Sequence, residues 1–380
     1  MSANLPSDGL QLLSTLEADG TLRLSLGRTP VVQPGDSEVT IAVEAAPINP
    51  SDMMTMFASA DPAQAAFAGE GEPRTVTARV TAEAAGQRAG RFGQPLAVGL
   101  ECAGTVIAAG TGAEHLIGER VAAISLTRGA FGQYLTVAAA QCAPLPDDVS
   151  SAEGAGVFCN PMTALAMVET LRLEGHGAMI QTAAASNLGQ MIVHICREDG
   201  IGLVNVVRRP EQAELLRALG AEHVVDSSLP TFREDLRRAA AATGARAAFD
   251  AIGGGTMVHE LHMAMEHAAI ARMGFYSPYG SPELKQVYIY GRLDTSPTVI
   301  DAGAYGMLWD VRHWYQGATM ERVSQQRAGE MLARVLAGLK TTFASHYART
   351  IPLAEALERD TMLAYARQAT GEKFLIDPRL

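Results

Sequence analysis

The feature that most constrains the fold is a regular alternation in the middle of the chain. Between about residues 160 and 300, short apolar runs typical of buried strands alternate with segments of helix length. Strands are predicted at residues 178–182, 203–207, 223–225 and 247–251, and helices at residues 188–197 and 211–219. Strands separated by helices predict βαβ units, and therefore a parallel sheet with helices on both faces.

The first 150 residues have a different pattern. They contain short predicted strands, for example residues 39–43, 104–109 and 134–137, separated by turns rich in glycine. Helices are expected beyond residue 320, and a final strand at residues 373–376. The chain therefore combines a β-rich part with an α/β part.

One segment departs from this pattern. Residues 59–94 are rich in Ala, Gly, Glu and Arg, and only residues 75–80 resemble a strand. We predict an insertion or an extended surface hairpin here, and we expect mobility rather than chemistry.

Composition excludes several classes of protein. A chain of 380 residues can form two domains, and 48% hydrophobic with 19% charged residues is typical of a globular protein. A net charge of -11 argues against nucleic acid or an anionic membrane as a partner. No apolar run is long enough to span a bilayer and no leader is recognisable, so a cytoplasmic location is expected. The four scattered cysteines predict free thiols.

A candidate phosphate-binding turn follows the first strand of the α/β part. Residues 179–191, MIQTAAASNLGQM, lead from a predicted strand through small residues into a predicted helix. A pyrophosphate can bind the N–H groups of such a helix N-terminus when no bulky side chain blocks the backbone. Ala184, Ser186 and Gly189 stand at the three G-x-G-x-x-G positions, and Asn187 suits the turn. An ordinary strand–helix turn is the alternative.

Two arginines after the second strand favour one cofactor. Arg208 lies about 20 residues beyond Gly189, and Arg209 follows it. NAD-selective proteins tend to carry an acidic residue at this place, whereas arginine suits the 2′-phosphate of NADP. Glu211 is the discordant neighbour, and unliganded surface arginines are the alternative.

The run from Ile180 to Val225 resembles the cofactor-binding half of the mitochondrial trans-2-enoyl thioester reductases. These belong to the medium-chain dehydrogenase/reductase superfamily, together with the zeta-crystallin-like quinone oxidoreductases. Four further segments match superfamily positions in order: INPSD at 48–52, VGLECAGTV at 98–106, CNPMTA at 159–164 and GEKFLI at 371–376.

This resemblance implies an α/β fold of two domains. A GroES-like, β-rich catalytic domain would be formed by both chain ends, residues 1–157 and 319–380, with residues 59–94 as an insertion. A Rossmann domain, a doubly wound parallel sheet, would comprise residues 158–318. The active site is expected in the cleft between them, and a homodimer is expected by analogy.

The resemblance also implies roles for individual residues. The turn from Thr182 through Ala183, Ala184, Ser186, Asn187 and Leu188 to Gly189 would bind the pyrophosphate, and Arg208 with Arg209 the 2′-phosphate of NADPH. The nicotinamide side would be lined by Asn160, Thr163, Tyr290, Gly291, Arg292, Leu293, His313, Trp314, Tyr315 and Lys373. Asn49, Asn160, Tyr290 and Tyr315 are the predicted catalytic residues.

No metal is expected. In zinc-dependent relatives a Cys, a His-Glu pair and a second Cys occupy places that here hold Asn49, Leu100-Glu101 and Asn160. Leucine cannot bind zinc, and amides are poor ligands. Without a Lewis acid to stabilise an alkoxide, oxidation of simple alcohols is disfavoured.

Three functions remain open from the sequence. The first is NADPH-dependent hydride transfer to a quinone or an α,β-unsaturated carbonyl compound. The second is a 2-enoyl thioester reductase, although the tyrosine that such enzymes use in protonation is replaced by Ala60, with Phe57 the nearest aromatic residue. The third is a non-catalytic NADPH-binding sensor or structural protein.

Overall fold

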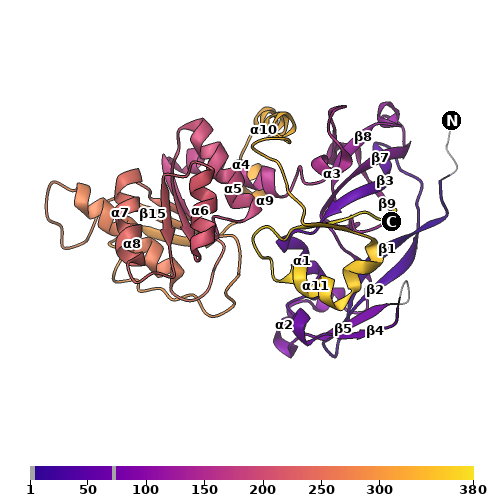
Figure 1. Cartoon of the computed structure of the whole chain (residues 1–380), viewed down its shortest axis with the longest axis horizontal. Helices are drawn as coiled ribbons and strands as arrows, with labels where there is room; N and C mark the ends of the chain where they lie inside the picture. Colours follow the sequence, from indigo (N-terminus) through magenta and orange to yellow (C-terminus); the bar gives the residue numbers. More distant parts are fainter. Residues whose placement is uncertain (1–4, 71–73) are drawn as a thin grey trace. The chain divides into compact units, whose positions relative to one another are not determined.

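A computed structural model describes residues 5–70 and 74–380. The chain forms two compact units, Met1–Cys159 with Val335–Leu380, and Asn160–Arg334 (Figure 1). The sequence predicts boundaries after residues 157 and 318. The first lies close to the observed position. The second lies after Arg334, because the Thr319 hydroxyl bonds that of Thr170 at 2.8 Å and so ties this part of the chain to the second unit.

The first unit contains two sheets. Its strands are β1 (Asp8–Leu16), β2 (Thr21–Pro30), β3 (Glu38–Pro47), β4 (Ala66–Ala68), β5 (Thr75–Arg79), β6 (Leu96–Ala97), β7 (Glu101–Ala109), β8 (Arg120–Ile124), β9 (Tyr134–Ala138), β10 (Cys142–Pro144), β17 (Arg349–Ile351) and β18 (Phe374–Ile376). The strand orders are β4-β5-β2-β1-β6 and β10-β8-β7-β3-β18-β17, with β9 also on β3. Since β18 pairs with β3, the end of the chain is part of this unit.

Short helices complete the first unit. They are the α-helices α1 (Pro50–Phe57), α2 (Ala82–Gly86), α3 (Ser151–Gly154) and α11 (Arg359–Ala366), and the 3-10 helices η1 (Pro62–Gln64), η2 (Ala89–Arg91), η3 (Glu114–Leu116), η4 (Ala139–Gln141) and η5 (Leu353–Leu357). α1 begins at Asn49, whose backbone N–H donates to the Asp52 carboxylate. This bond places the predicted catalytic residue Asn49 at the start of a helix.

The described part of residues 59–94 packs into the first unit, so the expected surface hairpin accounts for only part of it, and the expected insertion and mobility stay predictions. β4 and β5 do form a hairpin-like antiparallel pair, but β5 also pairs with β2 and so belongs to the sheet. Val76 and Ala85 lie in the hydrophobic core, and Arg91 donates to Thr55 O and Ser14 O. The alanine-rich composition hid this core, because alanine buries little surface and gives a weak periodic signal. Residues 71–73 lie outside the described part.

The second unit is the predicted doubly wound sheet. Its six strands, all parallel, are ordered β13-β12-β11-β14-β15-β16. Their bounds are β11 (Ala178–Gln181), β12 (Gly202–Val207), β13 (His223–Asp226), β14 (Ala247–Asp250), β15 (Lys285–Ile289) and β16 (Trp309–His313). The helices are α4 (Asn160–Glu174), α5 (Asn187–Asp199), α6 (Pro210–Ala218), α7 (Phe232–Thr243), α8 (Met257–Arg272), α9 (Gln316–Met320) and α10 (Gln325–Ala337).

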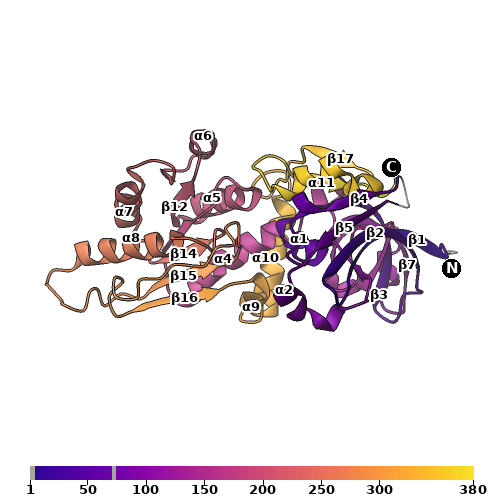
Figure 2. The ribbon, with the colours of Figure 1, turned by 90° about the horizontal axis from the view of Figure 1, so that it is seen from below.

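Helices cover both faces of this sheet, as expected for alternating strands and helices. One cluster joins α7 and α8, through Leu236 and Leu261, to Ile180 and Val287 of the strands. A separate cluster joins α5 and α6 to the sheet through Val193 and Leu216. Figure 2 shows α8 running alongside β14 and β15. No helix among the described residues is long and apolar enough to cross a membrane.

Candidate functional site

The turn that follows β11 is built to leave a helix N-terminus accessible. Ser186 caps α5, its hydroxyl oxygen accepting from the Gly189 N–H at 3.1 Å. Ala183 adopts a left-handed conformation, with φ at 49°. Such backbone is uncommon for alanine and often marks functional turns. The first N–H groups of α5 and its positive dipole end make this turn suitable for an anion.

Gly189 is required by close packing. A Cβ added there would lie 2.2 Å from the Ala184 carbonyl oxygen and 2.6 Å from its carbonyl carbon. Both contacts are to backbone, which cannot move away as a flexible side chain can. Ala184 itself is fully buried in a hydrophobic cluster, so its methyl group is not on the surface of the turn. The loss of two fingerprint glycines is therefore compatible with a phosphate site.

Three polar residues beneath the turn, Gln181, Asn205 and Asp250, were not identified from the sequence, whereas the neighbouring Thr182 was predicted to bind the pyrophosphate. Gln181 is buried in β11, and its amide donates to the Gly189 carbonyl at 3.1 Å and to Asn205 of β12 at 2.7 Å. The neighbouring Thr182 hydroxyl donates to Asp250 at 2.7 Å. The Thr182 hydroxyl therefore has no proton left to donate to a phosphate. The sequence feature that could have identified these residues is a polar side chain within or just after an otherwise apolar strand.

The two arginines lie at the same sheet edge as the turn. β11 and β12 are parallel neighbours, so Thr182 and Arg208 each follow the carboxyl end of a strand. Arg208 and Arg209 are exposed. Among residues 5–70 and 74–380, neither guanidinium has a hydrogen bond or ion pair. Glu211 is also exposed, in the first turn of α6. Two cations are therefore available to an anion at this edge.

The segment after β15 reaches the same edge. The Tyr290 N–H donates to the Asp250 carbonyl at 2.9 Å, and the Leu293 N–H to the Ala251 carbonyl at 3.1 Å. Burial raises the pKa of the Tyr290 hydroxyl, which therefore stays protonated. Gly291 packs closely, since an added Cβ would lie 2.7 Å from the Ala251 oxygen. Arg292 donates to Thr295 O.

The other predicted residues of this unit differ in their surroundings. The Trp314 indole is buried, contacts Phe249 edge-on, and donates to the hydroxyls of Thr170 and Thr319. It is thus a core side chain, whereas Tyr315 is 64% exposed. Cofactor roles for His313, Trp314 and Tyr315 stay predictions. The same holds for Asn160, the first residue of α4, and for Thr163, whose hydroxyl donates to Gln316.

In the first unit, Asn49 is held by a buried carboxylate. Its amide donates to Glu101 at 2.9 Å, and the other Glu101 oxygen accepts from the Phe158 and Cys159 N–H groups. Glu101 is fully buried. The Asn49 donor is therefore occupied, while its amide oxygen has no hydrogen-bond partner among the described residues. The catalytic role of Asn49 stays a prediction.

Lys373 and Cys159 belong to the same cluster. Lys373 Nζ is buried, has no hydrogen-bond partner in the described part of the chain, and lies 5.6 Å from the Tyr347 ring centroid. Burial lowers its pKa, and the charge of Glu101 opposes that shift. Burial raises the pKa of the Cys159 thiol well above its ordinary value.

The zinc positions hold side chains that are poor ligands. Asn49 is an amide bonded to Glu101, Leu100 is apolar, and Asn160 is an amide. Within residues 5–70 and 74–380, no group of three His, Cys, Asp or Glu side chains is arranged to hold a metal ion.

Asp52 makes the stability of the first unit depend on pH. Burial raises its pKa to about 7, and the charge of Glu101 acts in the same direction. In the unfolded chain the pKa of an aspartate is near 3.9, so the folded state binds this proton more tightly. The free energy of unfolding should therefore fall as the pH rises from about 4 to about 7.

The variant Asp52→Asn removes this titration and keeps an oxygen for the Asn49 N–H. We expect it to lose less stability than the wild type between about pH 5 and about pH 8, measured by denaturant unfolding at both pH values. Equal losses in the two proteins would show that Asp52 does not titrate in this range.

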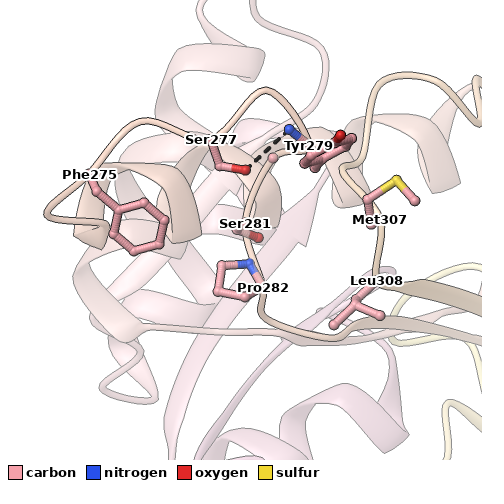
Figure 3. A pocket seen from close by; sticks show the side chains of 8 residues that line it. Phe275, Ser277, Tyr279, Ser281, Pro282, Met307 and Leu308 are labelled. Carbon is pink, nitrogen blue, oxygen red and sulfur yellow. Dashed lines mark hydrogen bonds between the residues drawn. The ribbon is translucent and has the colours of Figure 1, made fainter.

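A pocket in the second unit lies away from the sheet edge that holds the turn and the two arginines. It has a volume of about 340 Å³ and is lined by Phe275, Ser277, Tyr279, Gly280, Ser281, Pro282, Met307 and Leu308 (Figure 3). These residues precede β15 and β16, at the amino ends of the strands. Ligands of open parallel sheets bind at the carboxyl ends. The pocket is therefore not the candidate cofactor site.

Two family models match the chain. Residues 35–147 match the alcohol dehydrogenase GroES-like domain, and residues 188–301 match the zinc-binding dehydrogenase family. Among solved structures, a candidate NADPH:quinone reductase from Mesorhizobium loti is 27% identical with a TM-score of 0.73, covering 99% of this chain and 100% of that one.

Curated relatives include a reductase and several synthases. The 2-haloacrylate reductase of a Burkholderia species is 26% identical over 288 residues, 74% of this chain and 81% of that protein. The phthioceranic/hydroxyphthioceranic acid synthase of Mycobacterium tuberculosis is 25% identical over 255 residues, 67% of this chain. This chain spans only 11% of the length of that synthase, so the similarity concerns one part of a much larger protein.

Proposed function

Because the chain belongs to the zinc-free branch of the medium-chain dehydrogenase/reductase superfamily, we propose that it is an NADPH-dependent oxidoreductase. Its proposed substrate is a quinone or a small α,β-unsaturated carbonyl compound. The observation that carries the cofactor assignment is the pair Arg208 and Arg209, unpaired within the described residues, beside a helix N-terminus bordered by Gly189.

The residues fit NADPH in two respects. The turn at residues 182–189 offers small side chains and the N-terminus of α5 to a pyrophosphate, and Arg208 offers charge-assisted hydrogen bonds to a 2′-phosphate. Bound NADPH would supply the hydride. Relatives named for NADPH:quinone reduction and for 2-haloacrylate reduction support this cofactor and an electron-poor double bond as the acceptor.

The chain's own residues would orient the substrate and supply the proton. Tyr290 is a candidate donor, because it follows β15 at the carboxyl edge of the sheet, where the cofactor is proposed to bind. Asn49 offers an amide oxygen, and Lys373 a buried amine that has no partner in the described part of the chain. Since Leu100 cannot bind zinc and the amide of Asn49 is a poor ligand, we expect no zinc ion there to stabilise an alkoxide. Oxidation of a simple alcohol is therefore not proposed.

A second candidate is the reduction of a 2-enoyl thioester. The similarity to part of the mycobacterial acid synthases favours it. The place of the expected tyrosine argues against it, because Ala60 is buried and Phe57 lies in the hydrophobic core. NADPH binding without turnover is a third candidate.

Initial rates of NADPH oxidation with a panel of acceptors separate these candidates. We expect the protein to oxidise NADPH when benzoquinone or cyclohexenone is the acceptor. We expect it not to reduce NADP when propan-2-ol is the hydride donor. Crotonyl-CoA as the best substrate would favour the second candidate. Tight binding of NADPH with no acceptor reduced would favour the third. A purified protein that does not bind NADPH would contradict all three.

A further inference from the structure

We infer that Asp250 is a positioning residue for the dinucleotide site, an inference that rests on the proposed function. Asp250 is the last residue of β14 and is fully buried. Its carboxylate accepts from three donors: the Thr182 hydroxyl at 2.7 Å, the Ile252 N–H at 3.0 Å and the Gly253 N–H at 2.9 Å. We call Thr182, Asp250, Ile252 and Gly253 the carboxyl-edge buckle.

On one side, the buckle fixes the start of the phosphate-binding turn. Thr182 is the first residue after β11, and its hydroxyl donates to Asp250 while accepting from the Ala251 N–H at 2.8 Å. The Thr182 N–H also donates to the Phe249 carbonyl at 3.1 Å. The hydroxyl and the N–H of Thr182 thus both bond to β14 or to the residue after it. Ala183 follows directly in its left-handed conformation.

On the other side, the buckle fixes the segment after β15. Gly253 has a φ of 77°, and an added Cβ would lie 2.6 Å from the Gly291 carbonyl oxygen. The Asp294 N–H donates to the Ile252 carbonyl at 2.9 Å. The loop ordered by the Asp250 carboxylate is therefore packed directly against residues 290–294.

The Asp250 side chain is held by hydrogen bonds from neutral donors. No lysine, arginine or histidine in the described ranges forms an ion pair with it, and a buried carboxylate without a counter-ion depends on its donors. In Asp250→Asn, an amide NH₂ replaces one oxygen and would face an N–H or hydroxyl donor. The hydrogen bonds that fix both the turn and the loop packed against residues 290–294 would then be weakened.

The experiment compares NADPH dissociation constants, measured by nicotinamide fluorescence, with thermal unfolding midpoints. Asp250→Asn and Thr182→Val should each raise the dissociation constant about tenfold or more, because each leaves a buried donor or acceptor unpaired beneath the turn. Thr182→Ser keeps the hydroxyl and should stay within about threefold of the wild type.

Thr40→Val is the matched control. Thr40 is also fully buried with its hydroxyl bonded, to Thr136 in the first unit, so its loss should lower stability with little change in NADPH affinity. If Thr182→Val binds NADPH as well as Thr40→Val does, the inference is wrong. If Asp250→Asn does not fold, the comparison of Thr182→Val with Thr182→Ser still tests the inference. A wild-type protein that fails to bind NADPH would instead overturn the proposed function.

Discussion

Replacing Gly189 by alanine is expected to raise the NADPH dissociation constant at least about a hundredfold and to lower the free energy of unfolding by about 2 kcal/mol. The added methyl carbon would lie 2.2 Å from the Ala184 carbonyl oxygen. That oxygen belongs to the turn, whose next residues lead to the cap of α5. Relief of the clash must therefore move either the turn or the helix N-terminus. Both are surfaces on which the pyrophosphate is proposed to lie.

The control for this variant is Gly177→Ala. Gly177 precedes β11 in the same unit, and an added Cβ there meets no other atom within 4 Å. It should bind NADPH as the wild type does. Affinity is measured by fluorescence titration and stability by denaturant unfolding. A Gly189→Ala protein that binds NADPH normally would contradict the proposed place of the pyrophosphate.

The α/β unit could be predicted from the sequence because its strands are buried on both faces. Buried strands give continuous apolar runs, and glycines such as Gly200 and Gly220 mark where helices end. β15 and β16 were missed. β16 is half-exposed and carries Asp310, Arg312 and His313, so it lacks the apolar run of a buried strand.

The candidate site could be predicted only in part. The turn and Arg208 are local in sequence, so their spacing indicates their role. The contacts of Asp250 with Thr182, and of Glu101 with Asn49, join residues far apart in the chain. Periodicity carries no information on such pairs. One available signal was missed, because Asp250 ends an apolar strand and a buried acidic residue needs partners.

Replacing Arg208 by alanine is expected to lower the affinity for NADPH much more than the affinity for NADH. NADPH differs from NADH by the 2′-phosphate, and Arg208 is proposed to donate charge-assisted hydrogen bonds to it. Such bonds contribute about 1.5–3 kcal/mol each, which corresponds to an affinity change of about 10- to 100-fold. Arg208→Ala removes the donors and nothing that NADH would use. Because Arg208 is exposed, its replacement should change the free energy of unfolding by no more than about 0.5 kcal/mol.

Arg209→Ala serves as the comparison, because Arg209 carries the same charge one residue later, at the cap of α6. Its effect on NADPH affinity should be smaller than that of Arg208→Ala. An equal loss of NADPH affinity in the two variants would indicate that both arginines bind the 2′-phosphate.

The most direct test of the account is a titration of Arg208→Ala and wild type with NADPH and with NADH. The account predicts that the variant loses about 10- to 100-fold in affinity for NADPH and less than about threefold for NADH. Equal losses for the two cofactors, or no loss for either, would contradict it.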